Sequence, residues 1–343
     1  MLSDNVVAVY GATGHTGRLV VADLARRGHP IRLGGRDAAA LAALAERLDV
    51  DTEVVVAELD DPSGLRRLTG GSAVLINCAG PYSRSGEPVA AAAVATGTHY
   101  LGHAAEPLHV KRMYDTHAGA GVVVIPGMSF FGGLADLFAA QVVEGMPTVE
   151  EIVVAHAVTG WRMTTASKAV AGVLSGAESV TYTDGRVRVS EPGPRRTGSF
   201  AFPAPLGRRQ VIEGYPAGEV VTIPRHVPAR TVRVVMTIST FAEETVLSSE
   251  DITPDERARS TFTLALQAVG PADTRGGWIE GRDIYGTGAV ISVEAASRLA
   301  RNSHSGRTGA LSPAEAFAPT EFLAALPGLE VHIESQVATH ASG

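Results

Sequence analysis

Residues 7–17 read Val-Ala-Val-Tyr-Gly-Ala-Thr-Gly-His-Thr-Gly, and this stretch decides the fold. An apolar strand runs into a glycine-rich turn, and residues 18–27 are predicted to form a helix. This order points the first helix amides and the positive end of the helix dipole at the space above the turn, where a pyrophosphate fits. Gly11 permits the tight turn, Gly14 lets the backbone approach the phosphates, and Gly17 lets helix and strand pack closely. The pattern predicts a dinucleotide site. The competing interpretation is a glycine-rich turn without a ligand.

The second expected strand indicates which dinucleotide binds. Residues 31–35 read as this strand, and Arg36 and Asp37 follow it. NAD-specific sites usually place a carboxylate there to hold the ribose 2′-hydroxyl. A guanidinium instead makes a two-pronged, charge-assisted contact with a 2′-phosphate, so we expect NADP(H). The alternative for Arg36 is an ordinary exposed arginine, and Asp37 suits the N-cap of the alanine-rich helix at 38–48.

Composition limits the class of protein. The chain has 343 residues, 45% of them hydrophobic and 19% charged, which is enough for a packed core and two domains. No apolar run approaches the roughly 18 residues of a membrane helix, and the N-terminus lacks the basic start of a signal peptide. A net charge of −7 without a basic patch argues against nucleic acid as a partner. The single cysteine, Cys78, suits a reducing cytoplasm, where we expect the protein to act.

The chain changes character near residue 128. Before it, strands and helices alternate, as in a parallel sheet covered on both faces. The strands are expected at 6–10, 31–35, 53–58, 73–78 and 121–125. After it, turns such as the one at 183–185 favour a mostly antiparallel sheet. Here the strands are expected at 151–159, 186–189, 219–223 and 231–239, helices at 164–178, 254–269 and 288–302, and a loop at 191–210.

Several sequence segments, in order along the chain, resemble motifs of the saccharopine dehydrogenase-like NADP oxidoreductases. This family includes saccharopine reductases and trans-acting enoyl reductases. The segments are Gly11 to Val20, Leu33 to Asp37, Asn77 to Tyr82 with Gly86, Gly97 to Glu106, Tyr285 to Gly288 with Glu294 to Ala296, and Leu311 to Phe317. The resemblance is weakest between 180 and 275.

The resemblance implies an α/β architecture in which a Rossmann-type domain (1–127) carries an inserted, mixed α+β substrate domain (128–279). A C-terminal segment (280–343) is expected to return to the Rossmann domain. The family also implies that the backbone of the turn after the fourth strand faces the cofactor. The expected cofactor contacts are therefore Gly11, Ala12, Thr13, Gly14, His15, Thr16, Gly17, Arg36, Ala79, Gly80 and Pro81.

The chain departs from the family where the substrate side is expected. The family commonly has Asp two residues after the tyrosine of its Gly-Thr-His-Tyr phrase and Gly before the glutamate, where this chain has Gly102 and Ala105. Of a family turn rich in Asp, Ser and Pro, the stretch at 129–136 keeps only Phe130 and Asp136. The scaffold is inherited, but the substrate class need not be. Saccharopine itself is not expected, because its carboxylates and amines would need dedicated charged partners.

Hydride transfer also needs a proton source near the developing anion. The Tyr-x-x-x-Lys pair of short-chain dehydrogenases is absent, since Pro107 and Thr164 stand four residues before the only two lysines. The catalytic candidates are Tyr82, Tyr100 and His103. Each tyrosine is either a packing residue or a phenolic proton donor. The imidazole of His103 is either a structural group or a general acid near neutral pH.

Other reactive side chains have weaker arguments. His99, His103, Glu106 and His109 are spaced like metal ligands, but Gly97, Gly102 and Pro107 interrupt the helix that such a site needs, so no metal is expected. Cys78 ends an apolar strand and is expected to be a buried small residue. Lys168 is either solvated or contacts an anionic substrate group. Trp161 and Arg162 either line the same cleft or pack at the surface.

The sequence thus favours a cytoplasmic NADPH-dependent reductase. It would deliver hydride to a C=C, C=N or C=O bond of a small apolar metabolite or a lipid- or polyketide-like intermediate. The alternative is an NADP(H)-binding sensor that regulates a partner without catalysis, as in nitrogen-metabolite-repressor-like proteins. A third interpretation, an epimerase or dehydratase that recycles its cofactor, lacks the tyrosine–lysine pair. A homodimer formed through the substrate-domain sheet is also expected, although no residue specifies it.

Overall fold

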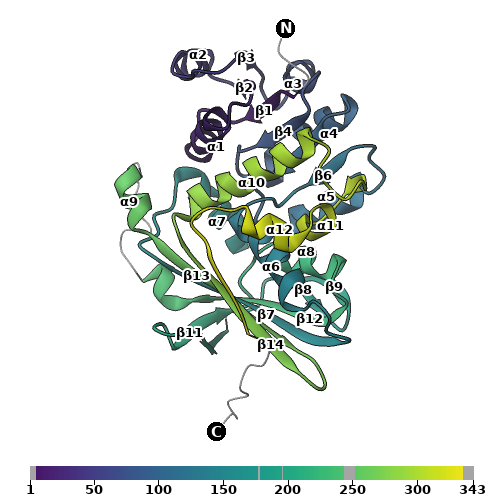
Figure 1. Ribbon diagram of the computed structural model, residues 1–343, viewed down its shortest axis with the longest axis vertical. Coiled ribbons are helices and arrows are strands. Elements are labelled where there is room, and N and C mark those ends of the chain that lie inside the picture. The colour runs from purple at the N-terminus through teal and green to yellow at the C-terminus, as the bar shows by residue number, and fades with distance from the viewer. Residues whose placement is uncertain (1–4, 177, 195, 243–251, 335–343) are drawn as a thin grey trace. The chain divides into compact units, whose positions relative to one another are not determined.

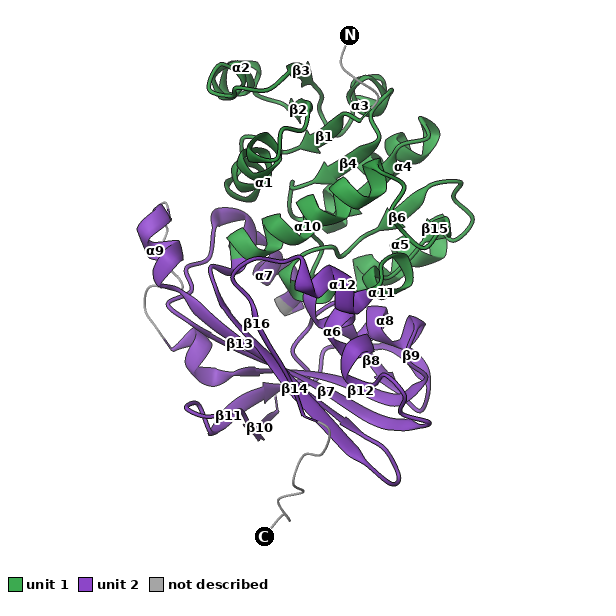
Figure 2. Ribbon diagram, viewed as in Figure 1, with its two compact units in different colours: residues 1–133, 285–318 green, residues 134–284, 319–343 purple. Residues whose placement is uncertain are grey.

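The computed structural model describes residues 5–176, 178–194, 196–242 and 252–334 (Figure 1). The chain forms two compact units (Figure 2). The first unit comprises residues 1–133 and 285–318, and the second comprises residues 134–284 and 319–343. Among the described residues, no helix combines the length and the apolar character needed to cross a membrane.

The first unit contains a seven-stranded sheet in which every pairing is parallel. The strand order is β15-β6-β5-β4-β1-β2-β3. The strands are β1 (Val7–Tyr10), β2 (Ile31–Gly35), β3 (Thr52–Val56), β4 (Val74–Asn77), β5 (His99–Gly102), β6 (Val123–Ile125) and β15 (Gly309–Ala310). The order reverses between β1 and β4, which is the switch point of a Rossmann-type sheet. The expected fold class is confirmed, and β15 adds an edge strand that the sequence did not indicate.

In the described part of this unit, five helices connect successive parallel strands, and two later helices flank β15. They are α1 (His15–Arg26), α2 (Ala38–Ala45), α3 (Pro62–Thr69), α4 (Tyr82–Ala95), α5 (Pro107–His117), α10 (Ile284–Ala300) and α11 (Pro313–Ala316). Asp37 caps α2 as predicted, because its carboxylate accepts a hydrogen bond from the Ala40 amide at 3.0 Å. The late helix α10 lies beside α1, joined to it by the Arg27–Glu294 ion pair at 2.7 Å (Figure 2).

The second unit contains a nine-stranded mixed sheet, in which β12 and β7 are parallel. The main order is β10-β11-β12-β7-β13-β14-β16, and β8 pairs with β12 and β9. The strands are β7 (Val149–Thr159), β8 (Ser179–Thr183), β9 (Arg186–Ser190), β10 (Thr197–Ala201), β11 (Arg208–Glu213), β12 (Ala229–Thr237), β13 (Thr261–Val269), β14 (Thr274–Arg282) and β16 (Glu330–Glu334). The helices are α6 (Ala135–Val142), α7 (Thr165–Gly176), α8 (Glu219–Thr222), α9 (Pro254–Arg259) and α12 (Pro319–Ala324). The π-helical turn η1 (Phe130–Leu134) precedes α6, and 3-10 turns lie at η2 (Ile223–Arg225) and η3 (Ile238–Phe241).

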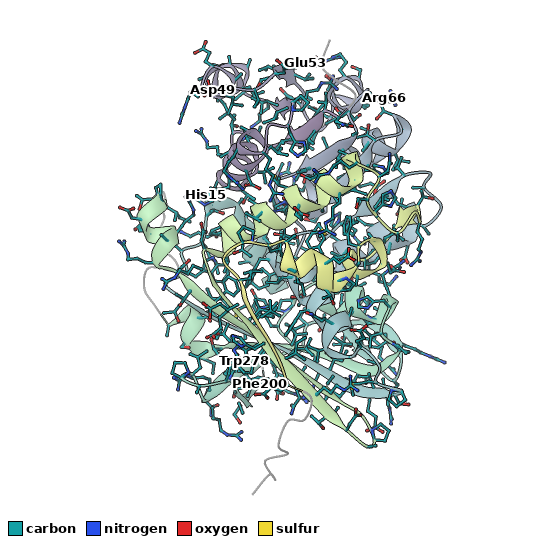
Figure 3. All side chains as sticks on the ribbon, in the orientation of Figure 1. His15, Asp49, Glu53, Arg66, Phe200 and Trp278 are labelled. Carbon is teal, nitrogen blue, oxygen red and sulfur yellow. The ribbon has the colours of Figure 1, made fainter. Side chains whose placement is uncertain are left out.

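The two faces of this second sheet differ in chemistry because successive side chains of a strand point to opposite faces. One face carries an apolar cluster of Val153, Ala155, Ala157, Phe202, Val211, Val235 and Ala265. Phe200 and Trp278 pack against it (Figure 3). The opposite face carries His156, which is fully buried and lies 3.1 Å from Glu219 of α8. A second pair joins the partly exposed His226 to the buried Asp136 of α6 at 2.9 Å.

Three local predictions in the second unit are wrong. Residues 219–223 form α8 and the start of η2 rather than a strand, because a short apolar run fits a buried helical turn as well as a strand. Only the polar start of 254–269 is helical, and the apolar remainder is β13, which is paired on both sides. The expected loop at 191–210 contains β10, whose partner is β11.

The expected domain boundaries also need a correction. The segment 280–343 does not return to the nucleotide-binding unit as one piece, because the chain divides at Ala318. Helix α12 packs on α6, and β16 pairs with β14, both within the second unit. The backbone hydrogen bonds that β16 makes with β14 explain why this strand stays with the second sheet.

Candidate cofactor site

The glycine-rich turn has the geometry that a bound phosphate needs. Gly11 has a φ of +75°, a left-handed conformation that other residues rarely adopt. Gly14 is the N-cap of α1. This helix begins at His15, three residues earlier than the predicted start at residue 18. A Cβ added to Gly17 would collide with the Gly11 carbonyl oxygen. The first amides of α1 have no acceptor within the helix, and they point toward the space above the turn, where an anion would bind.

The turn after β4 borders the glycine-rich turn. A Cβ on Gly11 would lie 3.0 Å from the Ala79 Cβ and 3.1 Å from the Ala79 nitrogen, so the two turns are in close contact. They lie at the carboxyl ends of β1 and β4, where the strand order reverses. Ligands of open α/β sheets bind outside these strand ends. The residues present therefore fit a dinucleotide.

A buried polar network shapes the turn after β4. The Asn77 side-chain oxygen accepts a hydrogen bond from the Ala79 amide at 3.0 Å, and the Asn77 side-chain nitrogen donates to the Tyr100 hydroxyl at 3.2 Å. The Ser85 hydroxyl donates to the Ala79 carbonyl. Asn77 and Ser85 were not predicted from the sequence as residues that shape the site. The available signal was an asparagine at the end of an apolar strand, since a buried amide needs hydrogen-bond partners.

Glu106 links the loop after β5 to the start of α4. The carboxylate of Glu106 accepts hydrogen bonds from the amides of Tyr82 at 2.8 Å, Ser83 at 3.4 Å and Ala105 at 3.2 Å. It is only 3% exposed. Burial raises the pKa of Glu106 above its ordinary value, and these amide donors oppose this effect only in part. A carboxylate thus occupies the N-terminus of α4, where helix amides lack partners.

The three predicted proton donors are buried in the first unit. Burial raises the pKa of Tyr82 and of Tyr100, and the nearby Glu106 carboxylate raises both further. Both phenols therefore carry their proton at neutral pH. Burial lowers the pKa of His103 to about 4, so its imidazole is neutral at pH 7. A neutral imidazole has only its ring N–H to give, and a catalytic role of His103 stays a prediction.

Arg36 directly follows β2, next to the strand end that holds the glycine-rich turn. The Gly34 carbonyl accepts hydrogen bonds from the Gly11 amide at 2.9 Å and the Ala12 amide at 3.2 Å. Arg36 is exposed. Burial raises the pKa of Tyr10 at the end of β1, and the positive charge of Arg36 opposes this effect. The guanidinium therefore lies close to the carboxyl end of β1, on the side of β2.

The remaining candidates have structural partners. His99 Nδ1 accepts a hydrogen bond from the Val123 amide at 3.0 Å. The His109 ring packs against the Cα of Gly86 so closely that no side chain fits there. Cys78 is buried, and burial raises the pKa of its thiol. In the second unit, Arg162 is buried and pairs with Glu256.

Two further groups of polar side chains lie at the start of α7 and on strands β14 and β16. The Thr164 hydroxyl accepts a hydrogen bond from the Ser167 amide at 3.0 Å, and Lys168 is half-buried on α7. Among the described residues, the His, Glu, Asp and Cys side chains that come within 4.8 Å of one another as a group are those of Glu280, Glu330 and His332. The four residues with metal-like spacing at 99–109 are not brought together in this way.

Comparison with known proteins agrees with this geometry. Residues 7–125 match the family model described as the saccharopine dehydrogenase NADP-binding domain. A trans-acting enoyl reductase of Mycobacterium leprae is 31% identical over 144 residues, which are 39% of this chain and 34% of that protein. A saccharopine dehydrogenase-like oxidoreductase of Bos taurus is 29% identical over 152 residues, which are 38% of this chain and 35% of that protein. The chain thus spans about a third of the length of these relatives.

A solved structure extends the likeness in fold. The apo saccharopine dehydrogenase (L-Glu forming) of Saccharomyces cerevisiae matches 97% of this chain and 100% of its own, with a TM-score of 0.67 and 11% identity. At this identity the match concerns the fold alone. Residues 7–125 of the chain are a saccharopine dehydrogenase-type NADP-binding domain, and its cofactor is NADP(H).

The collision at Gly17 gives a test of the site. Gly17→Ala should weaken NADPH binding by more than tenfold, because the new Cβ forces the turn or the helix to move. Such crowding costs about 1–3 kcal/mol of stability. Gly119→Ala is the matched control, since a Cβ there meets no atom within 4 Å. Calorimetric titration with NADPH measures both. Unchanged affinity in a folded Gly17→Ala protein would contradict the geometry.

The buried His103 predicts how stability depends on pH. Its folded pKa of about 4 lies below the ordinary value of 6.5, so the unfolded chain binds the extra proton between these values. The free energy of unfolding should therefore fall as the pH is lowered through this window. His103→Gln should remove about 2 kcal/mol of the loss between pH 7 and pH 5. Urea unfolding at both pH values tests this, and parallel pH profiles for the two proteins would refute it.

Proposed function

We propose that the chain is an NADPH-dependent reductase. The reaction is delivery of a hydride to a C=C, C=N or C=O bond of a small apolar metabolite or a lipid- or polyketide-like intermediate. The observation that carries the proposal is the NADP-binding domain, with its glycine-rich turn in contact with the turn after β4. The names of the relatives, enoyl reductase and saccharopine dehydrogenase-like oxidoreductase, support the same class of reaction.

Different residues of the first unit would bind different parts of the cofactor. Bound NADPH supplies the hydride. The amides at the start of α1 would hold the pyrophosphate, with contacts from Gly11, Ala12, Thr13, Gly14, His15, Thr16 and Gly17. Arg36 would pair with the 2′-phosphate, because a guanidinium matches phosphate oxygens in a two-pronged contact. The backbone of Ala79, Gly80 and Pro81 would face the nicotinamide half.

A reduction also consumes one proton, which goes to the carbon or heteroatom that becomes negative. Tyr82 and Tyr100 are suited to donate it, since both phenols are protonated at neutral pH. His103 is neutral and could donate only its ring N–H, leaving an anion that burial disfavours. A tyrosine that donates also leaves a buried anion, but a phenol is a stronger acid than the N–H of a neutral imidazole. We therefore rank the two tyrosines above His103 as the proton source.

The second unit supports an apolar substrate over a dicarboxylate. Its buried or partly buried basic groups already pair with carboxylates of the same unit. These pairs are His156 with Glu219, His226 with Asp136, and Arg162 with Glu256. A substrate with several carboxylates would have to displace these partners, and losing hydrogen bonds of buried groups is costly. A cytoplasmic location and a homodimer remain predictions.

Isotope transfer tests the proposal. NADPH carrying deuterium on one or the other face of C4 is supplied with an α,β-unsaturated thioester, a cyclic imine or a ketone. We expect one class to oxidise NADPH, followed at 340 nm, and to gain one deuterium from a single face of the cofactor. The product mass gives the result. Saturating NADPH binding with no transfer to any class would overturn the reductase proposal.

That negative result would favour the alternative function, an NADP(H)-binding sensor without catalysis. The glycine-rich turn and Arg36 would serve a sensor equally well, because neither takes part in hydride transfer. A sensor should bind a partner protein differently in the presence of NADP⁺ and of NADPH. The missing tyrosine–lysine pair is the observation that keeps this alternative open.

A further inference from the structure

The buried Glu106 carboxylate occupies a position that an anionic ligand could otherwise take. Helix α4 is 14 residues long, and its first amides point out of the helix beside the glycine-rich turn. Glu106 accepts hydrogen bonds from two of these amides, those of Tyr82 and Ser83. The N-terminus of α4 is therefore closed to a cofactor phosphate, whereas that of α1 has no side-chain cap. This difference directs the pyrophosphate to α1.

The strand order then places Glu106 on one side of the pyrophosphate. Arg36 follows β2, on one side of β1, and Glu106 belongs to the loop after β5, on the other side. The 2′-phosphate belongs to the adenosine half of NADP(H). If Arg36 holds that half, the nicotinamide half extends over the ends of β4 and β5. Glu106 lies just beyond the end of β5, between this strand and α5.

The charge of Glu106 is not balanced by a neighbouring cation. Within the described part of the chain, no ion pair joins Glu106 to a basic side chain. Amide donors from Tyr82, Ser83 and Ala105 stabilise the ionised carboxylate instead. A fixed negative charge in a buried region acts over several ångströms, because water screens it weakly.

We propose that Glu106 is a positioning residue that makes the site favour the oxidised cofactor over the reduced one. The nicotinamide ring is positively charged in NADP⁺ and neutral in NADPH, so the carboxylate stabilises NADP⁺ selectively. It also holds the turn after β4 in place through the Tyr82 amide. Given the reductase function proposed above, the consequence is that bound NADPH becomes a stronger hydride donor. The binding preference itself does not depend on turnover.

Two substitutions separate the charge of Glu106 from its capping role. Glu106→Gln keeps an oxygen that can accept from the Tyr82 amide but removes the charge, whereas Glu106→Ala removes both. Glu87→Gln is the matched control, because it removes a carboxylate on α4 that is 52% exposed and pairs with His117. The dissociation constants of NADP⁺ and NADPH are measured for all four proteins by calorimetry. The two cofactors share the 2′-phosphate and the pyrophosphate, so their ratio reports the nicotinamide environment.

For Glu106→Gln we expect NADP⁺ to bind about tenfold more weakly and NADPH to change less than threefold. Tenfold is the scale of one charge–charge interaction across about 12 Å at an effective dielectric of about 20. Glu106→Ala should weaken both and lower the melting temperature. Glu87→Gln should leave the ratio as in the wild type. An unchanged ratio in Glu106→Gln, whether both affinities fall together or neither moves, would overturn the proposal. Because no substrate is present, this outcome is independent of whether the reductase proposal holds.

Discussion

The close approach of the Gly17 backbone to the Gly11 carbonyl is the constraint on which the nucleotide-binding unit depends. It sets α1 against the end of β1, so that the first helix amides point above the turn. Gly11 in turn contacts Ala79, which brings the turn after β4 to the same place. A side chain at either glycine would separate these elements. Because Gly11 and Gly17 have no Cβ, α1 and the turn after β4 can both pack at the end of β1, where the strand order reverses.

Electrostatics along the carboxyl edge of the sheet follow from this packing. The N-terminus of α1 lies at the middle of the edge, Arg36 on the side of β2, and Glu106 on the side of β5. If NADP(H) binds as proposed, a positive group would stand beside its extra phosphate and a negative group beside its nicotinamide ring. The two helix termini differ because Glu106 caps α4, while α1 has no side-chain cap. The two sides of this edge of the sheet therefore differ in charge and in helix capping, a difference that the strand order alone would not give.

Structural features that depend on neighbouring residues could be predicted from the sequence, whereas contacts between residues far apart in the chain could not. The Rossmann strands, the Asp37 cap and the glycine-rich turn follow from local pattern and were predicted. Residues 219–223 were misassigned, because a short apolar run does not distinguish a strand from a buried helical turn. The cap of α4 by Glu106 joins residues 24 positions apart, and the His156–Glu219 pair joins residues 63 apart. Such contacts exist only once the elements have packed, so spacing in the sequence gives no signal for them.

The central claim is that the glycine-rich turn and Arg36 together bind a phosphorylated dinucleotide. Calorimetric titration of the purified full chain with NADPH and, separately, with NADH tests it most directly. We predict micromolar binding of NADPH and binding of NADH weaker by tenfold to a hundredfold, since pairing of a charged group with the 2′-phosphate contributes roughly 1.5–3 kcal/mol. Equal affinities would show that Arg36 does not read the 2′-phosphate. Absence of binding by both would contradict the account as a whole.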